Sequence, residues 1–185
     1  MSKQPEIVNL QQALDLAVSH HKAGCFTEAE TLYQQVLQTE PDHPTAMHML
    51  GVLAYQGGNN ELAVQRIARA LEIQPDLAEG HCNLGLALEG LGETDNAIAS
   101  YQKALALKPD YAEAYSNMGN ALQECGKLHD AIINYRKALA LNPDYASAYN
   151  NLGTALQKLD QPEEALTCFD QALSLQPEYV EAHYN

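Results

Sequence analysis

Apolar residues recur along this chain at the spacing of one face of a helix. Between residues 112 and 123 that face is formed by Tyr115, Met118, Gly119 and Leu122, which follow an i, i+3, i+4, i+7 pattern. A second stripe of the same kind comes after Gly126 and consists of Ala131, Tyr135, Ala138 and Leu139. This stretch predicts two amphipathic helices joined by a short turn.

The same pattern returns every 34 residues. The period is marked by evenly spaced prolines, each followed by an acidic residue: Pro41, Pro75, Pro109, Pro143 and Pro177. With the proline at position 32 of each repeat, the chain has a lead-in at 1–9, five repeats at 10–43, 44–77, 78–111, 112–145 and 146–179, and the start of a sixth at 180–185. Each repeat is expected to hold a helix A, a turn, and a helix B that ends before the proline. The turns fall at Gly24, Gly58, Gly92, Gly126 and Asp160.

Each repeat has a small residue at a fixed position of each helix and a large residue at a fixed position of helix B. Position 8 is Ala17, Gly51, Gly85, Gly119 and Gly153, position 20 is always alanine, and position 24 is Tyr33, Ile67, Tyr101, Tyr135 and Phe169. We expect helices A and B to cross closely at the small residues, with the large side chain of position 24 filling the space beside them. Asp110 and Glu113 have the spacing of a capping box at the start of the next helix A.

The repeats resemble those of the tetratricopeptide repeat (TPR) family in their length, in their pattern of small and large residues and in the closing proline. The resemblance covers residues 10–179 and departs at position 4, where no Trp stands. It implies an all-α fold, a right-handed α-solenoid of tandem helix-turn-helix repeats whose A helices line a concave groove. The stretch 111–123, YAEAYSNMGNALQ, also looks like repeats of the O-linked N-acetylglucosamine transferases and their bacterial relatives.

The side of helix A opposite the apolar stripe carries a row of asparagines. Position 6 is Asn83, Asn117 and Asn151 in three successive repeats. An amide can pair with both the N–H and the C=O of an extended peptide, whatever the peptide's sequence. In the transferases named above an asparagine ladder holds peptide in this way, and by resemblance these three positions match it. The alternative is that the amides only satisfy local backbone groups.

Other candidate residues fall near the same face. Asn120 and Asn150 would extend the amide row, and Glu113 would favour basic or neutral partners. Val52, Tyr55 and Leu86 would give the earlier repeats an apolar region that anchors a partner side chain. We therefore predict a protein-interaction module that binds an extended peptide or partner segment in the groove. The competing hypothesis is a structural scaffold that assembles through its repeats.

Composition narrows the classes of partner and chemistry. The net charge is −14 and no repeat is basic, which argues against binding nucleic acid or anionic membranes. No segment is long and apolar enough to insert into a membrane, and residues 1–9 lack a signal-peptide core. The histidines do not have the spacing of metal ligands, and the sequence contains no known catalytic motif. We therefore predict no enzymatic activity, no metal and no cofactor. The four cysteines fall at unrelated places in the repeat, so free thiols and a cytoplasmic location are expected.

The sequence stops six residues into the sixth repeat. We expect the chain to be the front part of a longer bacterial protein, and the second resemblance suggests a glycosyltransferase as the following domain. An incomplete last repeat would expose an apolar end face, through which two copies could associate.

Overall fold

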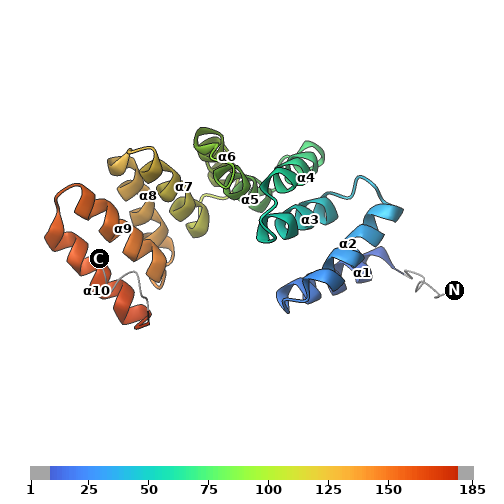
Figure 1. The fold of residues 1–185 in the computed structure, drawn as a ribbon, viewed down its shortest axis with the longest axis horizontal. Helices are drawn as coiled ribbons and strands as arrows, with labels where there is room; N and C mark the ends of the chain where they lie inside the picture. Colours follow the sequence, from blue (N-terminus) through green and yellow to red (C-terminus); the bar gives the residue numbers. More distant parts are fainter. Residues whose placement is uncertain (1–8, 179–185) are drawn as a thin grey trace. The chain divides into compact units, whose positions relative to one another are not determined.

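The computed structural model describes residues 9–178, and every regular element in this range is a helix (Figure 1). In chain order these are α1 (Leu10–Lys22), α2 (Phe26–Thr39), α3 (Pro44–Gln56), α4 (Asn60–Ile73), α5 (Ala78–Glu89), α6 (Thr94–Leu107), α7 (Ala112–Glu124), α8 (Leu128–Leu141), α9 (Ala146–Lys158) and α10 (Pro162–Leu175). The predicted all-α fold of tandem helix-turn-helix repeats is confirmed. The start of the sixth repeat lies outside the described residues. The predicted apolar end face would leave Tyr149, Leu152 and Leu156 of α9 without cover, but Leu152 and Leu156 are buried, at 4% and 0% exposure.

The chain divides into two compact parts, Met1–Ala87 and Leu88–Asn185. The division falls inside α5. The N-terminal part contains α1 to α4 and most of α5, and the C-terminal part contains the end of α5 and α6 to α10.

The turn between helix A and helix B has the same backbone conformation in all five repeats. One residue per turn has a left-handed φ: +76° at Gly24, +79° at Gly58, +75° at Gly92, +72° at Gly126 and +59° at Asp160. At the end of α7 this conformation lets the N–H groups of Gly126 and Lys127 bond back to the carbonyls of Gln123 and Leu122, at 3.0 and 2.9 Å. The last carbonyls of the helix are thereby satisfied.

Helices A and B of a repeat meet closely at the predicted small residues. A Cβ atom added to Gly119 of α7 would lie 2.5 Å from Cε1 of Tyr135 on α8. Equivalent additions would lie 2.5 Å from Cγ1 of Ile67 at Gly51, and 2.6 Å from Cε1 of Phe169 at Gly153. In these three repeats glycine at position 8 leaves room for the ring or branched side chain that packs on it, whereas the first repeat has Ala17 at this position.

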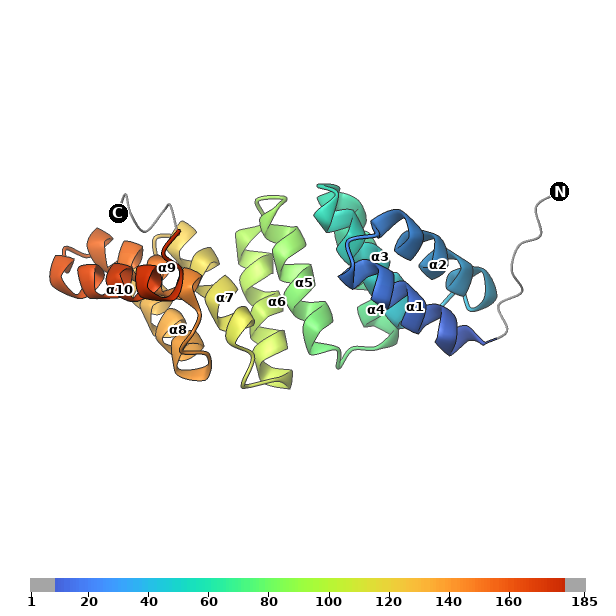
Figure 2. The ribbon, with the colours of Figure 1, turned by 90° about the horizontal axis from the view of Figure 1, so that it is seen from below.

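Helix B of one repeat also packs on helix A of the next, as α2 does on α3 and α8 on α9 (Figure 2). In the N-terminal part, Tyr33 and Val36 of α2 and Leu50 of α3 belong to one buried apolar cluster. Burying each such side chain stabilises the fold by about 1.5–3 kcal/mol. Because part of this burial is supplied by the neighbouring repeat, a single repeat is stabilised by the next one.

The predicted capping box at Asp110 and Glu113 does not form. Helix α7 begins at Ala112, and its first turn receives no hydrogen bond from the side chain of its N-cap residue, Tyr111. Asp110 precedes the cap by one residue and is out of register with the first turn. The ring of Tyr111 instead packs under Lys108, whose Nζ lies 4.6 Å from the ring centroid.

Candidate functional site

Positions 6 and 9 of α3, α5, α7 and α9 are half-buried, with one side packed and the other open to solvent. They lie three residues apart and so share one helix face. In the N-terminal part this face carries Met49 and Val52 on α3 and Asn83 and Leu86 on α5; in the C-terminal part it carries Asn117 and Asn120 on α7 and Asn151 and Thr154 on α9. Glu113, in the first turn of α7, is exposed.

In the N-terminal part a buried histidine holds Asn83. The Nδ2 of Asn83 donates a hydrogen bond to Nε2 of His48 on α3, across 2.9 Å. His48 is only 7% exposed, and burial lowers the pKa of its imidazole, although the charge of Glu79 acts in the opposite direction. A neutral ring provides the lone pair that this bond needs. No described residue donates a hydrogen bond to Oδ1 of Asn83, so this oxygen can accept one from a partner.

Val52 and Leu86 lie half-buried at position 9 of α3 and α5. Tyr55 is also half-buried, but it packs against the buried cluster of Ala63, Ile67, Leu71 and Ala87. Tyr55 therefore has a structural role in the N-terminal part in addition to any contact with a partner.

A single amide of the C-terminal part joins three helices. The Oδ1 of Asn120 on α7 accepts a hydrogen bond from the hydroxyl of Tyr135 on α8, at 2.8 Å, and another from Nδ2 of Asn151 on α9, at 2.9 Å. The Tyr135 side chain is fully buried. A core residue thus fixes the orientation of a surface amide. The two N–H groups of Asn120 bond to no described residue and can donate to a partner.

Asn150, which we predicted to extend the amide row, is buried, and its Nδ2 donates a hydrogen bond to Oδ1 of Asn151 at 3.4 Å. It is 6% exposed, and its carbonyl accepts a hydrogen bond from Oγ1 of Thr154 at 3.0 Å. Position 5 is buried in every repeat, as Leu14, His48, Cys82, Ser116 and Asn150. On a helical wheel with a single apolar stripe, position 5 falls on the side that faces solvent. Helix A also contacts the next helix A, as His48 of α3 does when it bonds to Asn83 of α5.

The sequence reasoning missed a pair of carboxylates in the C-terminal part. Glu89, at the end of α5, accepts a hydrogen bond from the hydroxyl of Tyr101 on α6. Burial and the charge of Glu124 raise the pKa of Glu89, while the bond from Tyr101 acts in the opposite direction. Burial, followed by the charges of Glu89 and Glu124, also raises the pKa of Tyr135. Both carboxylates therefore affect Tyr135, whose hydroxyl holds Asn120. The sequence signal that could have revealed Glu89 is the combination of Glu at position 12 with Tyr at position 24 in the repeat 78–111.

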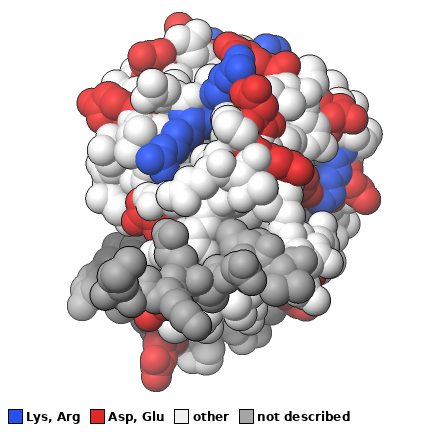
Figure 3. Space-filling view, turned by 90° about the vertical axis from the view of Figure 1, so that its right-hand side faces the viewer, with Lys and Arg blue, Asp and Glu red and all other residues white. Residues whose placement is uncertain are grey.

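The chain carries an excess of negative charge, with a net charge of −14. On the face shown in Figure 3, Lys and Arg side chains lie scattered among Asp and Glu. No helix between residues 9 and 178 is long and apolar enough to cross a bilayer. The same residues include no group of three or more His, Cys, Asp or Glu that could hold a metal ion. All four cysteines are free thiols.

Comparison with protein families agrees with this architecture. Models described as tetratricopeptide repeat match residues 20–81 and 110–178, and a model described as TPR repeat matches residues 90–125. The chain is built of tetratricopeptide repeats. No curated protein matches the sequence of this TPR chain.

Solved structures of TPR proteins share its fold. MamA is 26% identical, with a TM-score of 0.77, over 88% of this TPR chain and 95% of MamA. TTC0263, a thermophilic TPR protein of Thermus thermophilus, is 22% identical, with a TM-score of 0.76, over 95% of this chain and 96% of its own. YrrB, described as a TPR protein with an unusual peptide-binding site, is 22% identical, with a TM-score of 0.75, over 95% and 91% of the two chains.

Proposed function

We propose that this TPR chain is a protein-interaction module that binds an extended segment of a partner along the asparagine-bearing faces of its A helices. The observation that carries the proposal is the fixed amide of Asn120. Its Oδ1 is already bonded to Tyr135 and Asn151, so its N–H donors are held in one orientation. A side chain that is ordered before binding loses less conformational entropy when the partner arrives.

Asn83 supplies the opposite function in the N-terminal part. One N–H of its Nδ2 bonds to His48, and this bond fixes the orientation of Oδ1 as an acceptor for a partner. A peptide N–H would bond to Asn83, and a peptide C=O would bond to Asn120. Every peptide residue other than proline offers both groups, so this recognition does not depend on sequence.

Selectivity would come from side chains beside the amides. Val52 and Leu86 would contact apolar residues of the partner, and the carboxylates of Glu89, Glu113 and Glu124 would favour basic ones. YrrB shows that this fold accommodates a peptide-binding site. Four free thiols agree with a reducing compartment, for which the cytoplasm is our hypothesis. Delivery of bound segments to a glycosyltransferase domain stays a hypothesis that the comparisons do not support.

The test replaces Asn83, Asn117 and Asn151 together by alanine. Peptides that bind the wild-type chain would be selected from a random library, and their dissociation constants measured by fluorescence anisotropy. Each lost hydrogen bond is worth about 0.5–1.5 kcal/mol, so we expect affinity to fall roughly tenfold to a thousandfold. The loss should be similar for peptides of unrelated sequence, because the lost bonds go to the backbone.

A matched control replaces the exposed amides of Gln12, Gln102 and Gln171 by alanine. This variant removes the same number of amides from elsewhere on the helices, and its affinity should equal that of the wild type. If the asparagine variant is folded and binds equally well, the amides of Asn83, Asn117 and Asn151 are structural only, and the bond from Asn151 to Asn120 is not needed for binding. The scaffold hypothesis then takes first place, and it would be examined by measuring mass against concentration.

A further inference from the structure

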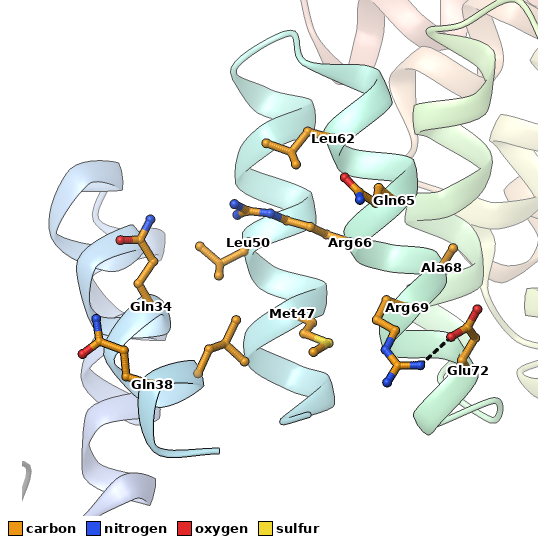
Figure 4. A pocket seen from close by; sticks show the side chains of 11 residues that line it. Gln34, Gln38, Met47, Leu50, Leu62, Gln65, Arg66, Ala68, Arg69 and Glu72 are labelled. Carbon is orange, nitrogen blue, oxygen red and sulfur yellow. Dashed lines mark hydrogen bonds and ion pairs between the residues drawn. The ribbon is translucent and has the colours of Figure 1, made fainter. Parts of the chain in front are cut away.

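The N-terminal part has a second cleft, formed by helices and residues that do not belong to the asparagine row. It lies between α2 and α4, with side chains of α3 in its floor, and has a volume of about 860 Å³ (Figure 4). The apolar lining includes Leu37 of α2, Met47 and Leu50 of α3, and Leu62 of α4. Gln38, Gln65 and Arg66 add polar groups to it.

The corresponding place in the C-terminal part is much smaller. The cleft lined by Ile98 of α6, Met118 of α7 and Asn134 of α8 has a volume of about 370 Å³. Position 4 of helix A is Met47 in α3 and Tyr115 in α7, and the Tyr115 ring packs under Lys137, whose Nζ lies 5.3 Å from the ring centroid. Met47 thus places a thin, flexible side chain in the larger cleft, at the repeat position where α7 has the ring of Tyr115.

A second difference concerns position 23 of helix B. Asn134 of α8 turns back on its own helix, and its Nδ2 donates a hydrogen bond to the carbonyl of Asp130 at 2.8 Å. At the same position α4 has Arg66, whose side chain extends from α4 into the cleft (Figure 4). The larger cleft therefore presents a cation where the smaller one has a short, internally bonded amide.

Arg66 makes no ion pair or hydrogen bond with any residue between 9 and 178, unlike its neighbour Arg69. The guanidinium of Arg69 bonds to Asp42 at 3.0 Å and to Glu72 at 2.8 Å. Lys22, Arg66 and Arg69 are the Lys and Arg residues of the described N-terminal part, and two of these three line the cleft. Glu72 also lines the cleft, and together with Asp42 it pairs with Arg69, so Arg66 is the cation of the lining that is left for a negative charge of a partner.

We propose that the cleft between α2 and α4 is a second docking site, and that its occupant is an acidic amphipathic helix of a partner protein. Apolar side chains of that helix would pack on Leu37, Met47 and Leu62, and a carboxylate beside them would pair with Arg66. A helix suits the site because its walls are helices, and α4 presents Leu62, Gln65 and Arg66 as a ridge at helical spacing. The glutamines would bond to polar groups at the edge of the partner helix.

The test uses a phage-displayed library of helical peptides of about 15 residues, randomised at the i, i+3, i+4 and i+7 positions of one face. Selection on the wild-type chain should enrich peptides that combine apolar residues with one Asp or Glu on that face. The affinity of an enriched peptide would then be measured by fluorescence anisotropy. Arg66→Gln should weaken it by about tenfold or more, because one charge-assisted contact is lost.

Two further variants make the result specific. Met47→Tyr introduces the side chain that position 4 has in α7, so it should fill the cleft and also weaken the peptide about tenfold or more while circular dichroism stays unchanged. Arg66→Glu, used in a fresh selection, should enrich Lys or Arg in place of the acid. Arg136→Gln, which removes a cation of α8 that pairs with Glu164, is the matched control and should leave affinity unchanged.

The combined alanine variant of Asn83, Asn117 and Asn151 should bind the acidic helical peptides as the wild type does, which separates this site from the asparagine row. The proposal is overturned if no acidic helical peptide is enriched, or if the enriched peptides bind equally well to folded Arg66→Gln and Met47→Tyr chains. It is also overturned if the cleft proves to hold a second copy of this chain, seen as dimerisation that Arg66→Gln abolishes.

Discussion

One small residue per repeat sets the distance between its two helices, and its influence reaches the surface. Gly119 lets the ring of Tyr135 pack directly on the backbone of α7. The hydroxyl of the same ring holds Asn120, a candidate binding residue. A change in the crossing of α7 and α8 should therefore disturb both stability and the orientation of the amide.

Gly119→Leu should lower the free energy of unfolding by about 1–3 kcal/mol, because the new side chain would overlap the Tyr135 ring and force the helices apart. The change would be measured by urea denaturation. Ala140→Leu adds the same side chain at an exposed position of α8 and should change stability by less than about 0.5 kcal/mol. Equal midpoints for Gly119→Leu and the wild type would show that the close contact is absent.

Asp160→Gly should stabilise the chain by roughly 0.5–1 kcal/mol. Asp160 has a φ of +59°, which strains a side chain with a Cβ atom, and the other four repeats have glycine at this turn. Thermal denaturation gives the measurement. Gln171→Gly, in the interior of α10, should instead destabilise by about 1 kcal/mol, since glycine gains nothing from a helical φ. Destabilisation by both substitutions would argue that the turn carries no strain.

At the scale of the helices, periodicity was sufficient to predict the pairs, their turns and the small and large residues between them. These features depend on spacing and residue size, which a sequence states directly. The burial of position 5 could not be predicted from one stripe, because helix A has a second contact, which His48 makes with Asn83 of α5. The bonds of Asn120 to Tyr135 and Asn151 depend on side-chain rotamers, and the cleft at Met47 depends on volume left between helices that are distant in sequence.

The contact between α3 and α5 should make stability depend on pH. Burial holds the pKa of His48 below its ordinary value, so between the two values the unfolded chain binds the proton more tightly than the folded chain. This contribution to stability is fully present above a pH of about 6.5 and is lost as the pH falls through the folded-state pKa. We expect the thermal midpoint to fall between pH values of about 7 and 5.

His48→Gln supplies the control, because glutamine can still accept a hydrogen bond from Asn83 but does not titrate in this range. Its thermal midpoint should fall less over the same pH interval, whatever its absolute value. Parallel pH profiles for the two chains would mean that His48 is not protonated on unfolding and that the acid sensitivity comes from other groups.

At the scale of the molecule, the net charge of −14 should act on partners through ionic strength. Binding of a lysine-containing extended peptide should weaken severalfold when salt rises from about 0.05 to 0.5 M, because the attraction between exposed charges is screened. A neutral peptide of matched length should keep its affinity, since its hydrogen bonds and apolar contacts are less sensitive to salt. Anisotropy titrations of both peptides at the two salt concentrations would check this, and equal salt dependence would argue against any role for the carboxylates.

The shared conformation of the five turns has a consequence for how such a chain can evolve. Because Gly92 and Gly126 have nearly equal φ values, removal of residues 93–126 would join Gly92 to Lys127 and leave an ordinary turn between α5 and α8. Unequal recombination at equivalent codons would therefore shorten or lengthen the array by whole repeats without creating a foreign junction. The number of repeats, and with it the length of the binding surface, is open to selection in single genetic steps.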